Sequence, residues 1–122
     1  MHNVKVVLPG GAGLVGQNLV VRLKARGCTN IVVIDKHAAN LTTMRRLHPG
    51  LTYEVADLAQ AGPWQRHFDG AQVVVMLQAQ IGGYRRDDFV RNTLDATREV
   101  LACVRQYQVP RLVHIKIGRA HV

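Results

Sequence analysis

The chain has 122 residues, which suffices for one domain but not for two. Hydrophobic residues make up 48% of it and charged residues 20%, a globular composition that excludes disordered and collagen-like chains, and no apolar run reaches the ~18 residues of a membrane-spanning helix. Sixteen Lys and Arg against eight Asp and Glu give a formal charge of +8, which is compatible with an anionic partner or ligand.

Strands and helices are expected to alternate along the chain. Short apolar runs indicate strands, and apolar residues at helical spacing indicate helices. In chain order they predict a strand at 4–8, a helix at 14–26, a strand at 31–34, a helix at 38–47, a strand at 51–55, a short helix or turn at 62–69, a strand at 71–77, a helix at 88–106 and a strand at 112–115. The helix at 88–106 is expected to face inward through Phe89, Leu94, Thr97, Val100, Leu101 and Val104.

This alternation predicts an α/β fold with a doubly wound parallel sheet. Helices would cover both sides of the sheet, so its strands are expected to be apolar on both faces. Right-handed crossovers favour five strands in the order 3-2-1-4-5, a Rossmann-type arrangement. We expect this domain to occupy residues 1–116.

The basic residues and the cysteines indicate no second site. The densest basic pairs are Arg45-Arg46 and Arg85-Arg86, and aromatic residues make up only 5%, too few for a base-stacking surface. We therefore predict solvated helix faces and neither nucleic acid nor a membrane as partner, although a basic nucleic-acid binder remains an alternative. Cys28 and Cys103 lie in apolar surroundings and are predicted to be buried thiols of a cytoplasmic protein. The six histidines share no metal-ligand spacing, so no metal is expected.

Between the first strand and the first helix lies a glycine-rich segment, Pro-Gly-Gly-Ala-Gly-Leu-Val-Gly, with the spacing G-x-x-G-x-x-G. Gly10 would permit a tight turn, Gly13 would let a pyrophosphate approach the backbone, and Gly16 would let the helix pack closely on the sheet. The N–H groups of Leu14, Val15 and Gly16, at the positive end of the helix, would hold the phosphates. By itself, the same pattern could mark a simple glycine-rich turn.

Asp35 strengthens the case for a dinucleotide site. It ends the second predicted strand, 19 residues after Gly16. A carboxylate at this place can accept hydrogen bonds from both hydroxyls of an adenosine ribose and would repel a 2′-phosphate, which favours NAD over NADP. The adjacent Lys36 could instead accommodate that phosphate. The alternative is that Asp35 is a solvated residue at a strand end.

Together these features resemble the extended short-chain dehydrogenase/reductase family, the NAD-dependent epimerases and dehydratases of nucleotide sugars. The family's loop reads T-G-x-x-G-x-[F/I]-[I/L]-G, and this chain has Pro9 in place of the Thr. The resemblance implies that Asp57 contacts the adenine amino group and Leu58 the adenine ring. It also implies that the segment VVVMLQA runs beneath the cofactor and that the helix after it contributes to the site; the residues implied there are Leu77, Gln78, Ala79 and Asn92.

The family's acid–base pair, Tyr-x-x-x-Lys, has no counterpart in this sequence. Its three tyrosines are followed four residues later by Asp57, Asp88 and Arg111, so we predict no catalytic residue here. The expected function is the NAD-binding portion of a nucleotide-sugar epimerase/dehydratase-like oxidoreductase, whose parent protein could form a homodimer. The alternative is a non-catalytic module that senses a dinucleotide.

The last residues depart from the family pattern. Residues 117–122, Ile-Gly-Arg-Ala-His-Val, are what ATC GGA AGA GCA CAC GTC would encode, and that string is the start of a common sequencing adapter without its leading AG. We therefore predict that 117–122 are a non-native tail and that the domain before them is truncated. A genuine basic C-terminus is the alternative.

Overall fold

A parallel five-stranded sheet forms the centre of the computed structural model, which describes residues 4–79 and 86–117 and, within them, the side chains of 4–77 and 93–115. The strand order is β3-β2-β1-β4-β5, which confirms the predicted order. All neighbouring strands are parallel, so their carboxyl ends lie at one edge of the sheet. The strands are β1 (Val6–Pro9), β2 (Ile31–Asp35), β3 (Thr52–Val55), β4 (Val73–Ala79) and β5 (Arg111–Ile117).

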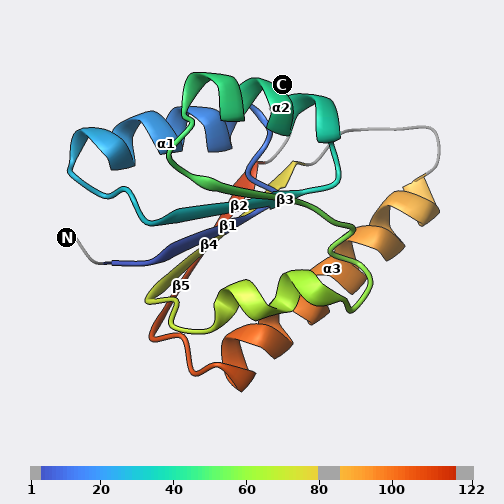
Figure 1. Ribbon diagram of the computed structural model, residues 1–122. Coiled ribbons are helices and arrows are strands. Elements are labelled where there is room, and N and C mark those ends of the chain that lie inside the picture. Colours follow the sequence, from blue (N-terminus) through green and yellow to red (C-terminus); the bar gives the residue numbers. More distant parts are fainter. Residues whose placement is uncertain (1–3, 80–85, 118–122) are drawn as a thin grey trace.

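Helices cover both faces of this sheet, as the alternation predicts (Figure 1). Two α-helices, α1 (Leu14–Ala25) and α2 (Ala38–Leu47), lie on one face. The other face carries α3 (Arg86–Gln106) and the short 3-10 helix η1 (Pro63–Phe68). The observed elements start and end within about two residues of the predicted ones. No helix in the described ranges is long and apolar enough to cross a membrane.

The hydrophobic core consists of two layers, one on each side of the sheet. β1 and β2 are buried along their whole length because each lies between two other strands and beneath helices on both faces. Cys28 is buried in the layer beneath α1 and α2, and Cys103 in the layer beneath α3 and η1. Both are free thiols, which confirms the prediction of buried core cysteines.

The outer strands are more exposed than the inner ones. Val55 of β3 and Val113 of β5 are 55% and 45% exposed, and each of these strands has a neighbour on one side only. One expectation about burial is wrong. The inward face of α3 is shifted. Leu94 and Leu101 are exposed, whereas the sequence predicted them to face inward. In the part of α3 whose side chains are described, the hydrophobic core contacts are made by Val100, Cys103 and Val104. The side chain of Phe89 lies outside those described.

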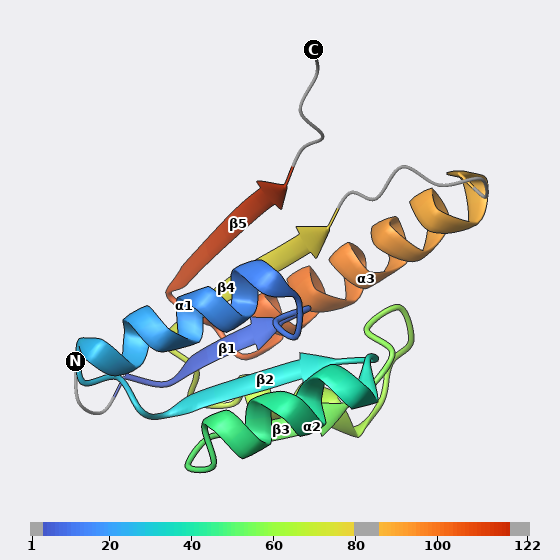
Figure 2. The same cartoon turned by 90° about the horizontal axis from the view of Figure 1, so that it is seen from above.

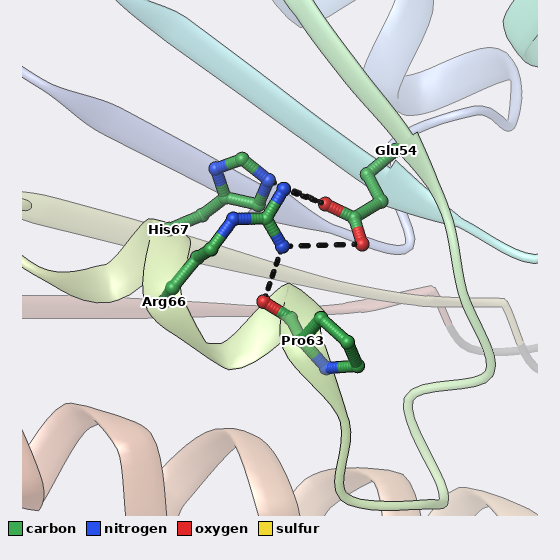
Figure 3. A network of polar contacts seen from close by, with 4 residues as sticks. All are labelled: Glu54, Pro63, Arg66 and His67. Atoms are coloured by element: carbon green, nitrogen blue, oxygen red, sulfur yellow. Dashed lines mark hydrogen bonds and ion pairs between the residues drawn. The ribbon is translucent and has the colours of Figure 1, made fainter.

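Hydrogen bonds and an ion pair connect η1 to the edge strand β3 (Figure 3). The Nε2–H of His67 donates to Glu54 Oε1 over 2.6 Å, and Arg66 Nη2 lies 3.0 Å from the same oxygen. Arg66 also donates to the carbonyl of Pro63. Partial burial raises the pKa of Glu54, but the hydrogen bonds and charges of His67 and Arg66 outweigh it, so the net pKa lies below its ordinary value.

The lowered pKa of Glu54 predicts how the unfolding free energy of the chain changes in acid. A carboxyl with a lower pKa in the folded state stabilises the fold above its unfolded pKa, about 4.3 for Glu, and loses that contribution as the pH falls through the folded pKa. Between about pH 5 and pH 3, the unfolding free energy of the wild type should therefore fall roughly 1 kcal/mol further than that of Glu54→Gln. Urea titrations at several pH values measure this difference.

The control for this experiment is Asp95→Asn. Asp95 lies 4.0 Å from Arg98, and both side chains are more than 40% exposed. This variant should lose as much stability in acid as the wild type does. A Glu54→Gln variant with the same acid dependence as the wild type would show that the contact contributes nothing to stability.

Candidate functional site

The glycine loop turns directly out of β1 at Gly10. This residue has a φ of +75°, a left-handed conformation that favours glycine, and its N–H donates to the carbonyl of Ile34 on β2 over 2.8 Å. A Cβ at Gly10 would also lie 2.3 Å from the carbonyl oxygen of Leu77 on β4. Gly10 therefore lets the chain turn sharply while it stays close to the strands on both sides of β1.

Gly16, in the first turn of α1, and Gly11, in the loop, are also closely packed. A Cβ at Gly16 would lie 2.0 Å from the carbonyl oxygen of Gly11, so the first turn of α1 packs against the loop itself. The sequence predicted close packing of Gly16 on the sheet; the closest neighbour is the loop backbone instead. Sequence reasoning assigned no role to Gly11, where a Cβ would lie 2.9 Å from Leu8 and 3.1 Å from Val33. The only sequence feature that could have indicated this close packing is the pair of adjacent glycines, Gly10 and Gly11.

Gly13 differs from these packed glycines because its surroundings are open. It is exposed and has an ordinary φ of −78°, and nothing lies within 4 Å of a Cβ built on it. Its carbonyl accepts the N–H of Gln17 at the start of α1. The next residue, Leu14, is 77% exposed, although the helical pattern would place it on the apolar face. The absence of a side chain at Gly13 is therefore not required by contacts within the described chain.

The N-terminus of α1 lies at this open space, and no side chain neutralises the partial positive charge of its backbone N–H groups. No side chain caps it, and its first turn contains no acidic residue. The first N–H groups of a helix, here those of Leu14, Val15 and Gly16, have no acceptor within the helix. They carry the positive end of the helix dipole, an arrangement that suits an anion.

Asp35 lies beside the glycine loop and accepts a hydrogen bond from its backbone. Only 6% of the residue is exposed. Its Oδ2 accepts the backbone N–H of Ala12 over 3.0 Å, and its Oδ1 accepts the N–H of His37 over 3.0 Å. A carboxylate oxygen has two lone pairs, so each oxygen retains acceptor capacity. The neighbouring Lys36 is exposed. Sequence reasoning placed Asp35 at this edge but did not foresee its bond to the loop.

The segment after β3 reaches the same edge. The N–H of Ala56 donates to the carbonyl of Asp35 over 2.9 Å, which places the following residues close to the loop's acidic partner. Asp57 is exposed, and its Oδ1 accepts the N–H of Ala59 over 2.9 Å. Leu58 is half-buried and packs against the core layer beneath α3 and η1.

β4 and α3 carry the other residues of the predicted site. Leu77 is buried, and its carbonyl oxygen faces Gly10 as described above. Gln78 and Ala79 end β4 and pair in register with β5, and Asn92 lies in α3, but the side chains of these three residues lie outside those described. Arg85 and residues 118–122 lie wholly outside the described residues.

The described side chains define the chemistry that this edge can support. This edge has uncapped backbone N–H groups at the start of α1, a glycine-rich loop and the buried carboxylate of Asp35, which together suit a phosphorylated molecule with hydroxyl groups. In the described ranges no three His, Cys, Asp or Glu residues come together as metal ligands.

A parallel sheet in this order, with a glycine loop after β1 and an acid at the end of β2, defines a Rossmann-type nucleotide-binding domain. The sequence matches the NAD dependent epimerase/dehydratase family over residues 6–116. The chain therefore belongs to the NAD-dependent epimerase/dehydratase family. A comparison with curated proteins found no match.

Solved structures share the fold at low sequence identity. Pen from Bacillus thuringiensis superimposes with a TM-score of 0.83 at 14% identity, over 92% of this chain and 37% of that one. WbmG from Bordetella bronchiseptica, solved with NAD and UDP, has a TM-score of 0.76 at 24% identity, over 90% and 36%. UDP-N-acetylglucosamine 4-epimerase from Methanobrevibacter ruminantium M1, in complex with UDP-N-acetylmuramic acid, has a TM-score of 0.73 at 21% identity, over 92% and 37%. The chain thus spans little more than a third of the length of these proteins.

Proposed function

We propose that this chain binds NAD, as the dinucleotide-binding portion of an epimerase/dehydratase-like oxidoreductase. The observation that carries the proposal is the hydrogen bond from Ala12 N–H to Asp35 Oδ2, because it joins the glycine loop and the strand-end acid into one unit. A dinucleotide has a pyrophosphate for the loop and a ribose for the acid, so one ligand would use both parts. Family membership supports the same ligand.

The residues present fit such a ligand. The pyrophosphate would lie over Gly13, where no side chain intervenes, and against the first N–H groups of α1. Asp35 would accept hydrogen bonds from the ribose hydroxyls with its remaining lone pairs. By family resemblance, Asp57 and Leu58 would contact the adenine. The end of β4 would run beneath the cofactor and α3 would contribute to the site, through Leu77, Gln78, Ala79 and Asn92. When bound, the nicotinamide would supply the group that accepts or donates a hydride.

Asp35 should set the preference between the two cofactors. A 2′-phosphate would bring negative charge against a buried carboxylate, so NAD should bind more tightly than NADP. Asp35→Ala removes hydrogen bonds to a charged group and should weaken NAD binding by about 1–3 kcal/mol. Because Asp35 also braces the loop, the decisive measurement is the ratio of the two affinities, since a loosened loop would weaken both ligands alike. Calorimetric titration with each cofactor gives this ratio.

The control for Asp35 is Asp69→Ala, at an exposed residue that follows η1 at the opposite edge of the sheet. This variant should keep the wild-type preference for NAD. Tighter binding of NADP than NAD by the wild-type chain would contradict the proposal, as would an unchanged affinity ratio in Asp35→Ala.

We also propose the setting in which this portion works. The parent would act on a nucleotide sugar in the cytoplasm, with its catalytic Tyr-x-x-x-Lys after residue 116 and residues 117–122 as a non-native tail. WbmG with bound UDP and the epimerase with a UDP-linked ligand support this substrate class, and two free thiols support a reducing compartment.

The alternative is a non-catalytic module that senses the dinucleotide. Such a module would keep the glycine loop and Asp35 but would have no Tyr-x-x-x-Lys after residue 116. Determining the transcript sequence beyond the codon for Lys116 separates the two. A downstream Tyr-x-x-x-Lys favours the enzyme, and a continuation without it favours the sensor.

A further inference from the structure

Basic side chains occupy the last turns of α1 and α2 and the residue after α1, all at the same edge of the sheet. We call Arg22, Lys24, Arg26, Arg45 and Arg46 the basic patch. The four arginines are exposed, and Lys24 is half-exposed. The Nζ of Lys24 lies 3.0 Å from Nδ1 of His48, the residue after α2, so the ends of the two helices are in contact. Figure 2 shows these ends at the start of β1 and β2, away from the carboxyl ends of the strands.

Acidic residues do not balance this charge. Residues 14–50 contain six Lys or Arg, the patch and Lys36, but a single acid, Asp35, which is buried at the other end of β2. Among the ion pairs of the described side chains, none includes a residue of the patch. Asp69 also lies at this edge, on the other face, where its backbone carbonyl accepts a hydrogen bond from Lys5.

The fold holds part of the patch in place without neutralising it. The guanidinium of Arg45 lies 5.5 Å from the centre of the Tyr53 ring. The Tyr53 hydroxyl donates toward the carbonyls of His48, at 2.6 Å, and Met44, at 3.1 Å, which fixes the ring under the end of α2. Burial and the charge of Lys24 lower the pKa of His48. The carbonyls at the helix ends favour nearby cations, but this effect does not cancel the charge presented to a partner.

We propose that the basic patch binds the phosphate backbone of double-stranded nucleic acid without reading its sequence. Arginine suits this partner because its planar guanidinium can pair with phosphate through two hydrogen bonds. A single strand is a poorer fit, because such sites stack bases on exposed aromatic rings. Of the aromatic side chains described, Trp64 and Phe68 are buried, and Tyr53 and Tyr107 are half-buried.

A membrane surface is also a poorer fit than a duplex. Helices that lie in a membrane interface bury an apolar face there. The apolar faces of α1 and α2 instead pack against the sheet, through Val20, Leu41 and Met44. Near the patch, only scattered apolar side chains such as Val21 and Leu47 are exposed. The patch thus offers charge without an insertion surface.

The proposal is tested by measuring the affinity of the 122-residue chain for a short random-sequence DNA duplex at several salt concentrations. Each phosphate contact contributes about −0.9 to the slope of log affinity against log salt. The double variants Arg45→Gln/Arg46→Gln and Arg22→Gln/Arg26→Gln should each make the slope shallower by about 2. The second pair leaves the contact of Arg45 with Tyr53 intact, so it remains informative if the first variant is unstable.

The matched control is Arg98→Gln/Arg105→Gln, which removes two exposed charges from α3 on the other face. It should leave the slope unchanged. Gly13→Val should also bind the duplex normally, because the glycine loop lies at the opposite edge of the sheet, so this proposal can fail or succeed independently of NAD binding.

Four results would overturn the proposal. They are absence of salt-dependent binding, an equal effect of the α3 control, tighter binding to single-stranded oligothymidine than to the duplex, and tighter binding to phosphatidylserine-containing vesicles than to the duplex. The control result would mean that net charge acts without a defined surface, and the last two would assign the patch to a different partner.

Discussion

Gly13→Val is expected to abolish NAD binding while the chain stays folded. The new side chain would occupy the space in which we place the pyrophosphate, and it would meet nothing else, because no atom lies within 4 Å of a Cβ at Gly13. Loss of two charge-assisted contacts, at about 1.5–3 kcal/mol each, lowers affinity by roughly 100-fold or more. A φ of −78° is ordinary for valine, so the backbone need not change.

Binding and stability are measured on the same variant, by calorimetric titration with NAD and by urea unfolding. Glycine is a better helix N-cap than valine, so we expect a loss of about 1 kcal/mol in unfolding free energy and no more. The matched control is Gly50→Val, in the turn after α2, where a Cβ likewise meets nothing within 4 Å. It should bind NAD normally. Undiminished affinity in Gly13→Val would mean that the glycine segment is only a turn.

The sheet order could be predicted from the sequence because it depends on local signals. Apolar runs of four or five residues alternate with helical patterns, and right-handed crossovers leave few ways to connect them. The glycine spacing and the position of Asp35 can also be read along the chain, and they predict that these residues lie at one edge of the sheet. The exposure of β3 and β5 cannot be predicted from such local patterns, because it depends on which strands lie at the edges of the sheet.

Contacts between distant residues could not be predicted in this way. The bond from Ala12 to Asp35 spans 23 positions, and its donor is a backbone group with no sequence signature. The basic patch is similar. Arg26 and Arg45 are 19 positions apart, and the sequence shows them as scattered charges, whereas parallel crossovers bring the ends of α1 and α2 to one place. A charge pattern therefore has to be judged on the folded chain.

Gly16→Ala, in the first turn of α1, should destabilise the chain strongly, with a loss of about 3 kcal/mol or more in unfolding free energy. In an ordinary helix the same change is favourable by about 1 kcal/mol, because alanine is the better helix former. Here the added Cβ would lie 2.0 Å from the carbonyl oxygen and 2.7 Å from the Cα of Gly11, and backbone cannot move aside as a flexible side chain can.

The first turn of α1 would have to separate from the loop to make room for this Cβ. Gly11 cannot retreat easily, since it already lies against Leu8 and Val33. Overpacking of this kind costs about 1–3 kcal/mol where side chains can adjust, and more where they cannot. Displacement of the helix would also move the N–H groups proposed to hold the pyrophosphate, so NAD affinity should fall together with stability. Urea unfolding measures the loss of stability, and calorimetry measures the loss of NAD affinity.

Asn18→Ala, at an exposed position of the same helix, serves as the control and should be neutral or slightly stabilising. A Gly16→Ala variant as stable as the wild type would show that the helix and the loop are not locked together.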